Sequence, residues 1–154
     1  MHDVTSPSGK PGPDALPAAW EHFAHAADIG VRGIGRTKAE AFEQAALALT
    51  AVTTRPELVR LATPVAIACD APSDEVLLVD WLNELVFEAA TRRWVFGAFE
   101  VDLDGPRLRA RAFGEPLDVA RHEPAVEVKG ATFTDVRVDR LPDGRWVAQC
   151  IVDV

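Results

Sequence analysis

The stretch Ser73–Arg93, SDEVLLVDWLNELVFEAATRR, carries the strongest structural signal in the chain. Ser73 is a favourable helix N-cap, and the acidic residues Asp74 and Glu75 suit the positive end of a helix. Apolar residues then recur at helical spacing and form one face: Leu78, Trp81, Leu82, Leu85 and Ala89. The stretch therefore predicts the longest helix of the chain, with one face buried.

A second helix is predicted towards the N-terminus, from Thr37 to about Thr53. Thr37 and Glu40 fit a capping box, in which the threonine hydroxyl accepts the amide of residue 40 and the Glu40 carboxylate reaches back to the cap amide. One apolar face follows the cap: Phe42, Ala45, Ala46 and Leu49. The helix is expected to end before Arg55-Pro56.

The remaining segments alternate apolar and polar residues, which is typical of strands. Strands are expected over residues 20–23, 31–36, 63–70, 94–103, 108–113, 126–129, 136–139 and 146–152. Gly33 and Gly35 in the second of these indicate a bulge or close packing. Two main helices with about seven or eight strands predict an α+β fold: a single two-layer domain in which helices cover a mostly antiparallel or mixed sheet.

The 154 residues fit one domain, expected over residues 19–154. Residues 1–18 are rich in proline and glycine and predict a disordered leader. The cysteines, Cys69 and Cys150, lie in apolar runs, where cysteine behaves as a small hydrophobe. No secretory signal is visible, and no apolar stretch is long enough to cross a bilayer. We therefore expect a cytoplasmic protein with no membrane partner.

The charge balance restricts the class of partner. The chain has 24 acidic and 16 basic residues, a formal net charge of -8. Proteins that bind nucleic acid directly usually present a basic face, so non-specific RNA binding is disfavoured. An acidic surface suits a basic protein partner or a divalent cation.

The first candidate site is the run His22, His25, Asp28. Histidine and carboxylate together can bind transition metals. If this segment is a strand, however, the two histidines point to opposite faces. Asp28 is expected in a loop between apolar flanks, followed by Gly30. It is either a turn-forming residue or, if buried, a paired or metal-bound carboxylate.

The second candidate is the end of the sequence. There the apolar strand closes with Asp153 and Val154, which brings a side-chain carboxylate next to the terminal carboxylate. Together with Asp28 they would supply the hard oxygen ligands that Ca²⁺, Mg²⁺ or Mn²⁺ prefers.

Two further polar regions have both a structural and a functional interpretation. Asp80, Glu84 and Glu88 lie at helical spacing and form either a solvated acidic face or a docking face for a partner. The polar stretch from Gly114 to Lys129 is either an ordinary charged connection or a functional loop. The chain has no Gly-x-Ser-x-Gly, Cys-x-x-Cys or Walker-type phosphate loop, which weakly disfavours an enzyme.

Taken in order, several segments resemble the archease family. They are residues 23–30 (FAHAADIG), 40–46 (EAFEQAA), 81–85 (WLNEL), 114–118 (GEPLD), His122, 127–129 (EVK), 146–148 (WVA) and 153–154 (DV). The resemblance extends over about residues 20–154. One departure is Thr134, which stands where the family often has a histidine and argues against a chemical role for this segment.

The resemblance implies a non-catalytic accessory protein of the GTP-dependent RNA-splicing ligase of the RtcB type. Such a protein promotes guanylylation of a ligase histidine, permits multiple turnover and meets RNA only indirectly. Carried over, the metal ligands are Asp28, Asp153 and Val154, with Ca²⁺ in the site and Mg²⁺ or Mn²⁺ as alternatives. Neighbours of the site or of the partner would be His25, Gly30, Glu84, His122 and Lys129.

Two other functions stay open from sequence. A metal-dependent hydrolase could use Asp28, His25 and His122 around a divalent ion, with His122 as the general base. A chaperone-like interaction module for RNA-modifying enzymes would need no metal.

Overall fold

The structure is a computed structural model that describes residues 16–154, so most of the predicted leader 1–18 lies outside the described residues. The strands are β1 (Ala19–His25), β2 (Asp28–Gly35), β3 (Thr63–Asp70), β4 (Trp94–Asp104), β5 (Arg107–Pro116), β6 (Gly130–Ala131), β7 (Arg137–Arg140) and β8 (Trp146–Asp153). The helices are α1 (Lys38–Thr53), η1 (Pro56–Leu58), α2 (Asp74–Arg92) and α3 (Val119–His122). Within the described residues, no helix combines the length and hydropathy that spanning a membrane requires.

Both long helices begin where the sequence predicts. The Thr37 hydroxyl accepts the Glu40 amide at the start of α1, and the Ser73 hydroxyl accepts the Val76 amide at the start of α2. The predicted capping box is wrong in one detail. The Glu40 carboxylate accepts the amide of Arg36, one residue before the cap, because it also binds the Arg36 guanidinium.

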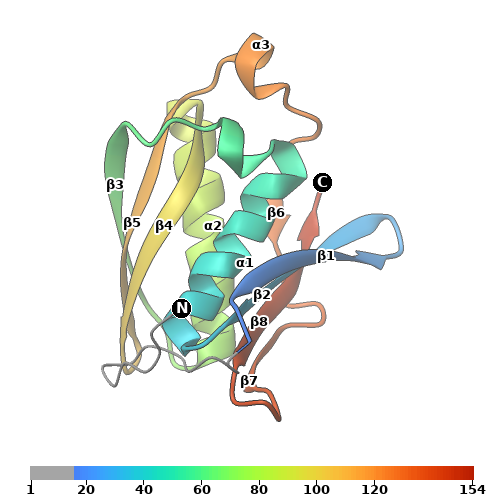
Figure 1. Ribbon diagram of the computed structural model, residues 1–154, viewed down its shortest axis with the longest axis vertical. Helices are drawn as coiled ribbons and strands as arrows, with labels where there is room; N and C mark the ends of the chain where they lie inside the picture. The colour runs from blue at the N-terminus through green and yellow to red at the C-terminus, as the bar shows by residue number, and fades with distance from the viewer. Residues whose placement is uncertain (1–15) are drawn as a thin grey trace, which may run out of the picture.

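The eight described strands form two antiparallel sheets (Figure 1). One has the order β1-β2-β8-β6, with β7 also paired to β8, and the other has the order β3-β5-β4. Helices α1 and α2 lie between the sheets, and each contacts strands of both. The α+β class and the antiparallel pairing are therefore confirmed. The single sheet covered by helices is instead two sheets with the helices between them.

Two strand predictions differ from the structure. Residues 28–30, expected in a loop, begin β2, and the turn of the β1–β2 hairpin is confined to residues 26–27. Residues 126–129, expected as a strand, have no ladder partner among residues 16–154. Alternation indicates an extended backbone, but a strand also needs a neighbour, and pairing with β8 begins only at Gly130.

Trp81 joins the layers of the core. Its side chain is fully buried, and its Nε1 donates to the Phe42 carbonyl oxygen of α1 at 3.1 Å. Its ring meets Phe99 of β4 edge to face, with centroids 6.0 Å apart. The predicted apolar face of α2 thus packs against both its neighbouring helix and a sheet.

Gly33 lets β2 approach α1 closely. A Cβ at this position would lie 2.2 Å from the Ala41 oxygen and 2.2 Å from the Ala45 nitrogen. Both atoms belong to the helix backbone and cannot move aside without moving the helix. The close packing that the sequence indicates at this glycine is confirmed.

We expect Gly33→Ala to lower the free energy of unfolding by about 1–3 kcal/mol or more, because the added methyl overpacks the β2–α1 contact. The matched control is Gly130→Ala, whose Cβ would meet Asn83 Oδ1 at an ordinary 3.4 Å. Urea denaturation of both variants measures the difference. Equal stability of the two would contradict the contact.

Candidate functional site

The ladder between β2 and β8 brings distant parts of the chain together. Its register runs from Ile29 opposite Val152 to Gly35 opposite Trp146. Asp28 precedes the first of these pairs and Asp153 follows it on the other strand. Antiparallel pairing therefore places the two carboxylates at the same end of adjacent strands.

The two carboxylates also share a face of the sheet. Arg32 and Gln149 are register partners, and Arg32 Nε donates to Gln149 Oε1 at 2.7 Å. The intervening Val31 and Cys150 are fully buried in the core with the helices. Because side chains alternate, Asp28 lies on the face of Arg32, and Asp153 lies on the face of Gln149. Both lie on the side away from the helical layer.

The last residues are fixed in place by their neighbours. The Asp153 carbonyl oxygen accepts the Lys129 amide at 2.8 Å, and Asp153 pairs with Gly130 of β6. Val154 packs against the core. Lys129 is therefore adjacent to this strand end through its main chain, while its side chain is exposed.

The two histidines of the first candidate separate, as predicted. His22 Nε2 contacts the Ala48 carbonyl oxygen of α1 at 2.7 Å. His25 points to the opposite face, where its Nε2 lies 3.7 Å from Asp135 Oδ2. His25 is also the register partner of Asp28 in the β1–β2 hairpin. It thus belongs with the carboxylate pair, and His22 does not.

Gly30 shapes the same face. A Cβ there would lie 2.3 Å from the Phe23 ring, so the absence of a side chain lets Phe23 lie across the strand. The Arg32 guanidinium stacks on that ring, 4.4 Å from its centroid. The Phe23 ring, with the Arg32 guanidinium stacked on it, therefore borders the Asp28 and Asp153 carboxylates on one side.

The carboxylates of Asp28 and Asp153 suit a hard divalent cation, but alone they do not complete its coordination shell. Neither Asp28 nor Asp153 has an ion-pair partner in the part of the chain that the structure describes. Within residues 16–154, no three His, Cys, Asp or Glu side chains are grouped with metal-binding geometry. Two carboxylates, main-chain oxygens and water would leave room for ligands from a partner.

Glu84 and His122 are the other two predicted neighbours. Glu84 is exposed on α2, where the adjacent Asn83 binds both the amide and the carbonyl of Ala131 in β6. His122 is fully buried in α3. Asp135 was not singled out from sequence, because an aspartate in a turn next to a threonine carries no distinguishing signal.

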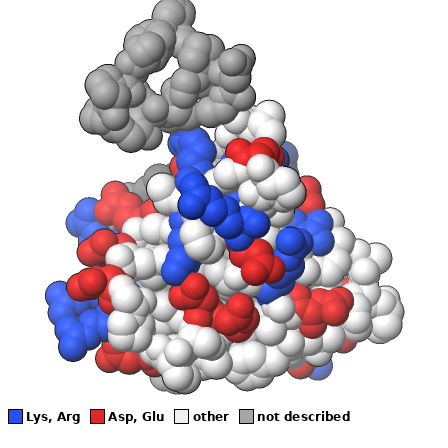
Figure 2. All heavy atoms as spheres, turned by 90° about the horizontal axis from the view of Figure 1, so that it is seen from below, with Lys and Arg blue, Asp and Glu red and all other residues white. Residues whose placement is uncertain are grey.

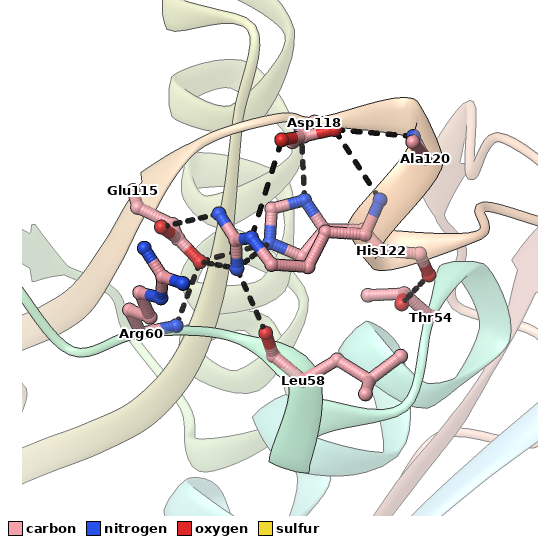
Figure 3. A network of polar contacts seen from close by, with 8 residues as sticks. Thr54, Leu58, Arg60, Glu115, Asp118, Ala120 and His122 are labelled. Atoms are coloured by element: carbon pink, nitrogen blue, oxygen red, sulfur yellow. Dashed lines mark hydrogen bonds and ion pairs between the residues drawn. The ribbon is translucent and has the colours of Figure 1, made fainter.

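His122 belongs to a buried polar network (Figure 3). Its Nδ1 accepts the Asp118 amide at 2.8 Å, so Nε2 carries the hydrogen and donates to Glu115 Oε2 at 2.9 Å. The Arg121 guanidinium holds the same carboxylate through both oxygens, at 2.6 and 2.8 Å. With both ring nitrogens engaged, His122 has no free nitrogen to act as a general base.

This network also fixes the charge of Glu115. The Arg121 guanidinium, followed by the Arg60 amide and His122, holds the pKa of this carboxyl well below its ordinary value, although its burial opposes the shift. Glu115 as a whole residue is 7% exposed. The network thus ties β5, α3 and the segment after α1 together.

Opposite charges are interspersed over the face that Figure 2 shows. Ion pairs occur between elements, as for Lys38 of α1 with Asp74 of α2 at 2.9 Å, and within one turn, as for Arg145 with Asp143 at 2.9 Å. This face therefore lacks the one-signed basic patch that a nucleic-acid interface presents.

Glu115→Gln tests the network through pH. A carboxyl whose pKa is lowered by folding stabilises the protein above its unfolded pKa, and that stability is lost as pH falls towards the folded pKa. The variant should therefore be less stable than the wild type at neutral pH, and the difference should shrink below about pH 4.5.

Chemical denaturation from neutral pH down to about pH 3 measures this difference. Glu100→Gln is the control, because it removes a carboxylate that is 61% exposed. A stability difference between Glu115→Gln and the wild type that stays constant with pH would contradict the assignment.

Comparison with known proteins shows to which protein family the chain is similar. Residues 20–154 match the Archease protein family (MTH1598/TM1083). The protein archease of Pyrococcus furiosus is 42% identical over 139 residues, covering 88% of this chain and 98% of that protein. The protein archease of Methanosarcina barkeri is 34% identical over 140 residues, covering 88% and 95% respectively.

Solved structures of related proteins have the same fold as this chain. The solution structure of Methanobacterium thermoautotrophicum protein 1598 is 34% identical, with a TM-score of 0.77, and covers 88% of this chain and 99% of that one. The crystal structure of an archease from Thermotoga maritima, 16% identical with a TM-score of 0.58 and complete coverage of both chains, shares the fold. The resemblance inferred from sequence is confirmed: the chain belongs to the archease family.

Proposed function

We propose that this protein is a metal-binding accessory protein that activates a GTP-dependent RNA-splicing ligase of the RtcB type by promoting its guanylylation. The observation that supports the proposal most is the β2–β8 register, which sets Asp28 and Asp153 on one face at one end of the sheet. The chain belongs to the archease family, and the resemblance seen in the sequence implies an RNA-splicing ligase as the partner.

The ion would be held by the carboxylates of Asp28 and Asp153 and by main-chain oxygen at Val154. Ca²⁺ is the ion that the family resemblance implies, and Mg²⁺ or Mn²⁺ would suit the same oxygen ligands. When bound, it would supply a divalent charge to phosphate groups at the ligase's nucleotide site. The chain itself positions the ligands through β2, β6 and β8 and borders them with Phe23.

An incomplete ligand shell at an exposed strand end favours an accessory role. A shell of this kind can be completed by a partner that contributes oxygens or phosphates. To activate the ligase, the protein must bind its guanylylation-competent state better than its spent state. The net charge of -8 supports contact with a basic active-site rim rather than with RNA directly.

The hydrolase alternative loses its general base, because His122 is buried and both of its ring nitrogens are engaged. Among residues 16–154, His25 would remain as the one histidine beside Asp28. A chaperone-like module is the second alternative. It would improve the solubility of several client enzymes without needing Asp28.

The decisive variant is Asp28→Asn, which removes one charge while keeping the side-chain shape. We expect the wild-type protein to raise ligase guanylylation and multiple-turnover ligation, and Asp28→Asn to lose at least about tenfold of that gain. Single-turnover and multiple-turnover ligation assays with equimolar protein measure both quantities.

Asp102→Asn is the matched control, since Asp102 is an exposed aspartate on β4 of the other sheet. It should activate like the wild type. Full activation by Asp28→Asn, with its thermal stability unchanged, would remove the carboxylate from the mechanism. Chelator-sensitive phosphoester turnover by the protein alone would favour the hydrolase.

A further inference from the structure

A separate cavity of about 630 Å³ lies at the end of the molecule where α1 and α2 finish. Its walls include apolar side chains of α1, α2 and β4: Leu49, Leu85, Val86, Phe96 and Phe99. Residues 124–128 cross its edge, tied to α1 by the Ala125 amide, which donates to the Thr53 carbonyl oxygen at 2.8 Å. The volume and the mostly apolar lining are those of small-molecule sites.

One cation lines this cavity. Arg93 is the only Lys or Arg among the lining residues, and it has no ion-pair partner among residues 16–154. Its neighbour Arg92, by contrast, pairs with Glu88 at 2.6 Å and stacks over Trp94. The one acidic lining residue, Glu127, is exposed on the crossing segment.

Amides cap part of the negative ends of α1 and α2 beside the cavity. Helix C-termini normally repel anions through their free carbonyls. Here the Thr50, Thr53 and Ala89 carbonyl oxygens each accept an amide, from Thr54, Ala125 and Arg93 respectively. Arg93 is exposed, so its guanidinium is the one full positive charge that the lining residues offer to an anion.

We propose that this cavity binds a small amphipathic molecule, with its apolar body between α1, α2 and β4 and its anionic head on Arg93. A medium-chain fatty acid has this chemistry. The cavity adjoins the end of β8, because Val128 lines it and the next residue, Lys129, donates its amide to the Asp153 carbonyl oxygen. Neither Asp28 nor Asp153 lines the cavity, and the binding test needs no ligase.

The probes are decanoate and decan-1-ol, which share the chain and differ in the charge of the head. Calorimetric titration of the full-length protein should show saturable binding of both, with decanoate the tighter. Arg93→Gln should weaken decanoate at least about tenfold and leave decan-1-ol unchanged, because it removes a charge-assisted hydrogen bond. Arg92→Gln should bind both probes like the wild type.

A second variant tests the cavity itself. Ala90 lines the cavity from α2 and is exposed, so Ala90→Phe should obstruct it and reduce the binding of both probes. Ala66→Phe places the same side chain at an exposed position on β3 and should bind like the wild type. The proposal is overturned by an absence of saturable binding, by equal effects of Ala90→Phe and Ala66→Phe, or by equal effects of Arg93→Gln on the two probes.

Discussion

The antiparallel ladder between β2 and β8 is the constraint on which the rest of the structure depends. It pairs residues that lie far apart in the chain, such as Arg32 and Gln149, which are 117 positions apart. Ordering so long a loop costs conformational entropy that later contacts must offset. Gly33 lets α1 pack directly on β2, and β8 accepts β6 and β7 on its other side. The helical layer and the first sheet are thus assembled around one strand pair.

Local elements were predictable because their signals are local. The capping threonine and serine, the apolar faces of both helices and the alternation over residues 63–70 each depend on neighbours within a few positions. The partner of a strand is not encoded in this way. Alternation along residues 126–129 matches that of a paired strand, yet no ladder forms there, and the division of the strands into two sheets has no local signature.

The candidate site, too, depends on strand pairing that the sequence does not reveal. Asp28 and Asp153 could each be singled out from their apolar flanks, but their adjacency follows only from the β2–β8 register. His122 attracted attention because it lies among polar residues, and the structure shows that those residues satisfy one another. The buried residues Glu115 and His122 form a network with the half-buried Arg121, and this network stabilises the region after α1. Polar side chains in a connection are therefore no guide to function until their partners are known.

We propose that a divalent ion binds where β2 begins and β8 ends. The most direct measurement is two-dimensional NMR of the labelled protein during titration with Mn²⁺, whose paramagnetism broadens signals from nearby amides. We expect the amides of Asp28, Ile29, Gly130 and Asp153 to broaden first, while those of α3 and the β7–β8 turn stay sharp. Broadening centred on the acidic face of α2, with the strand ends unaffected, would contradict it.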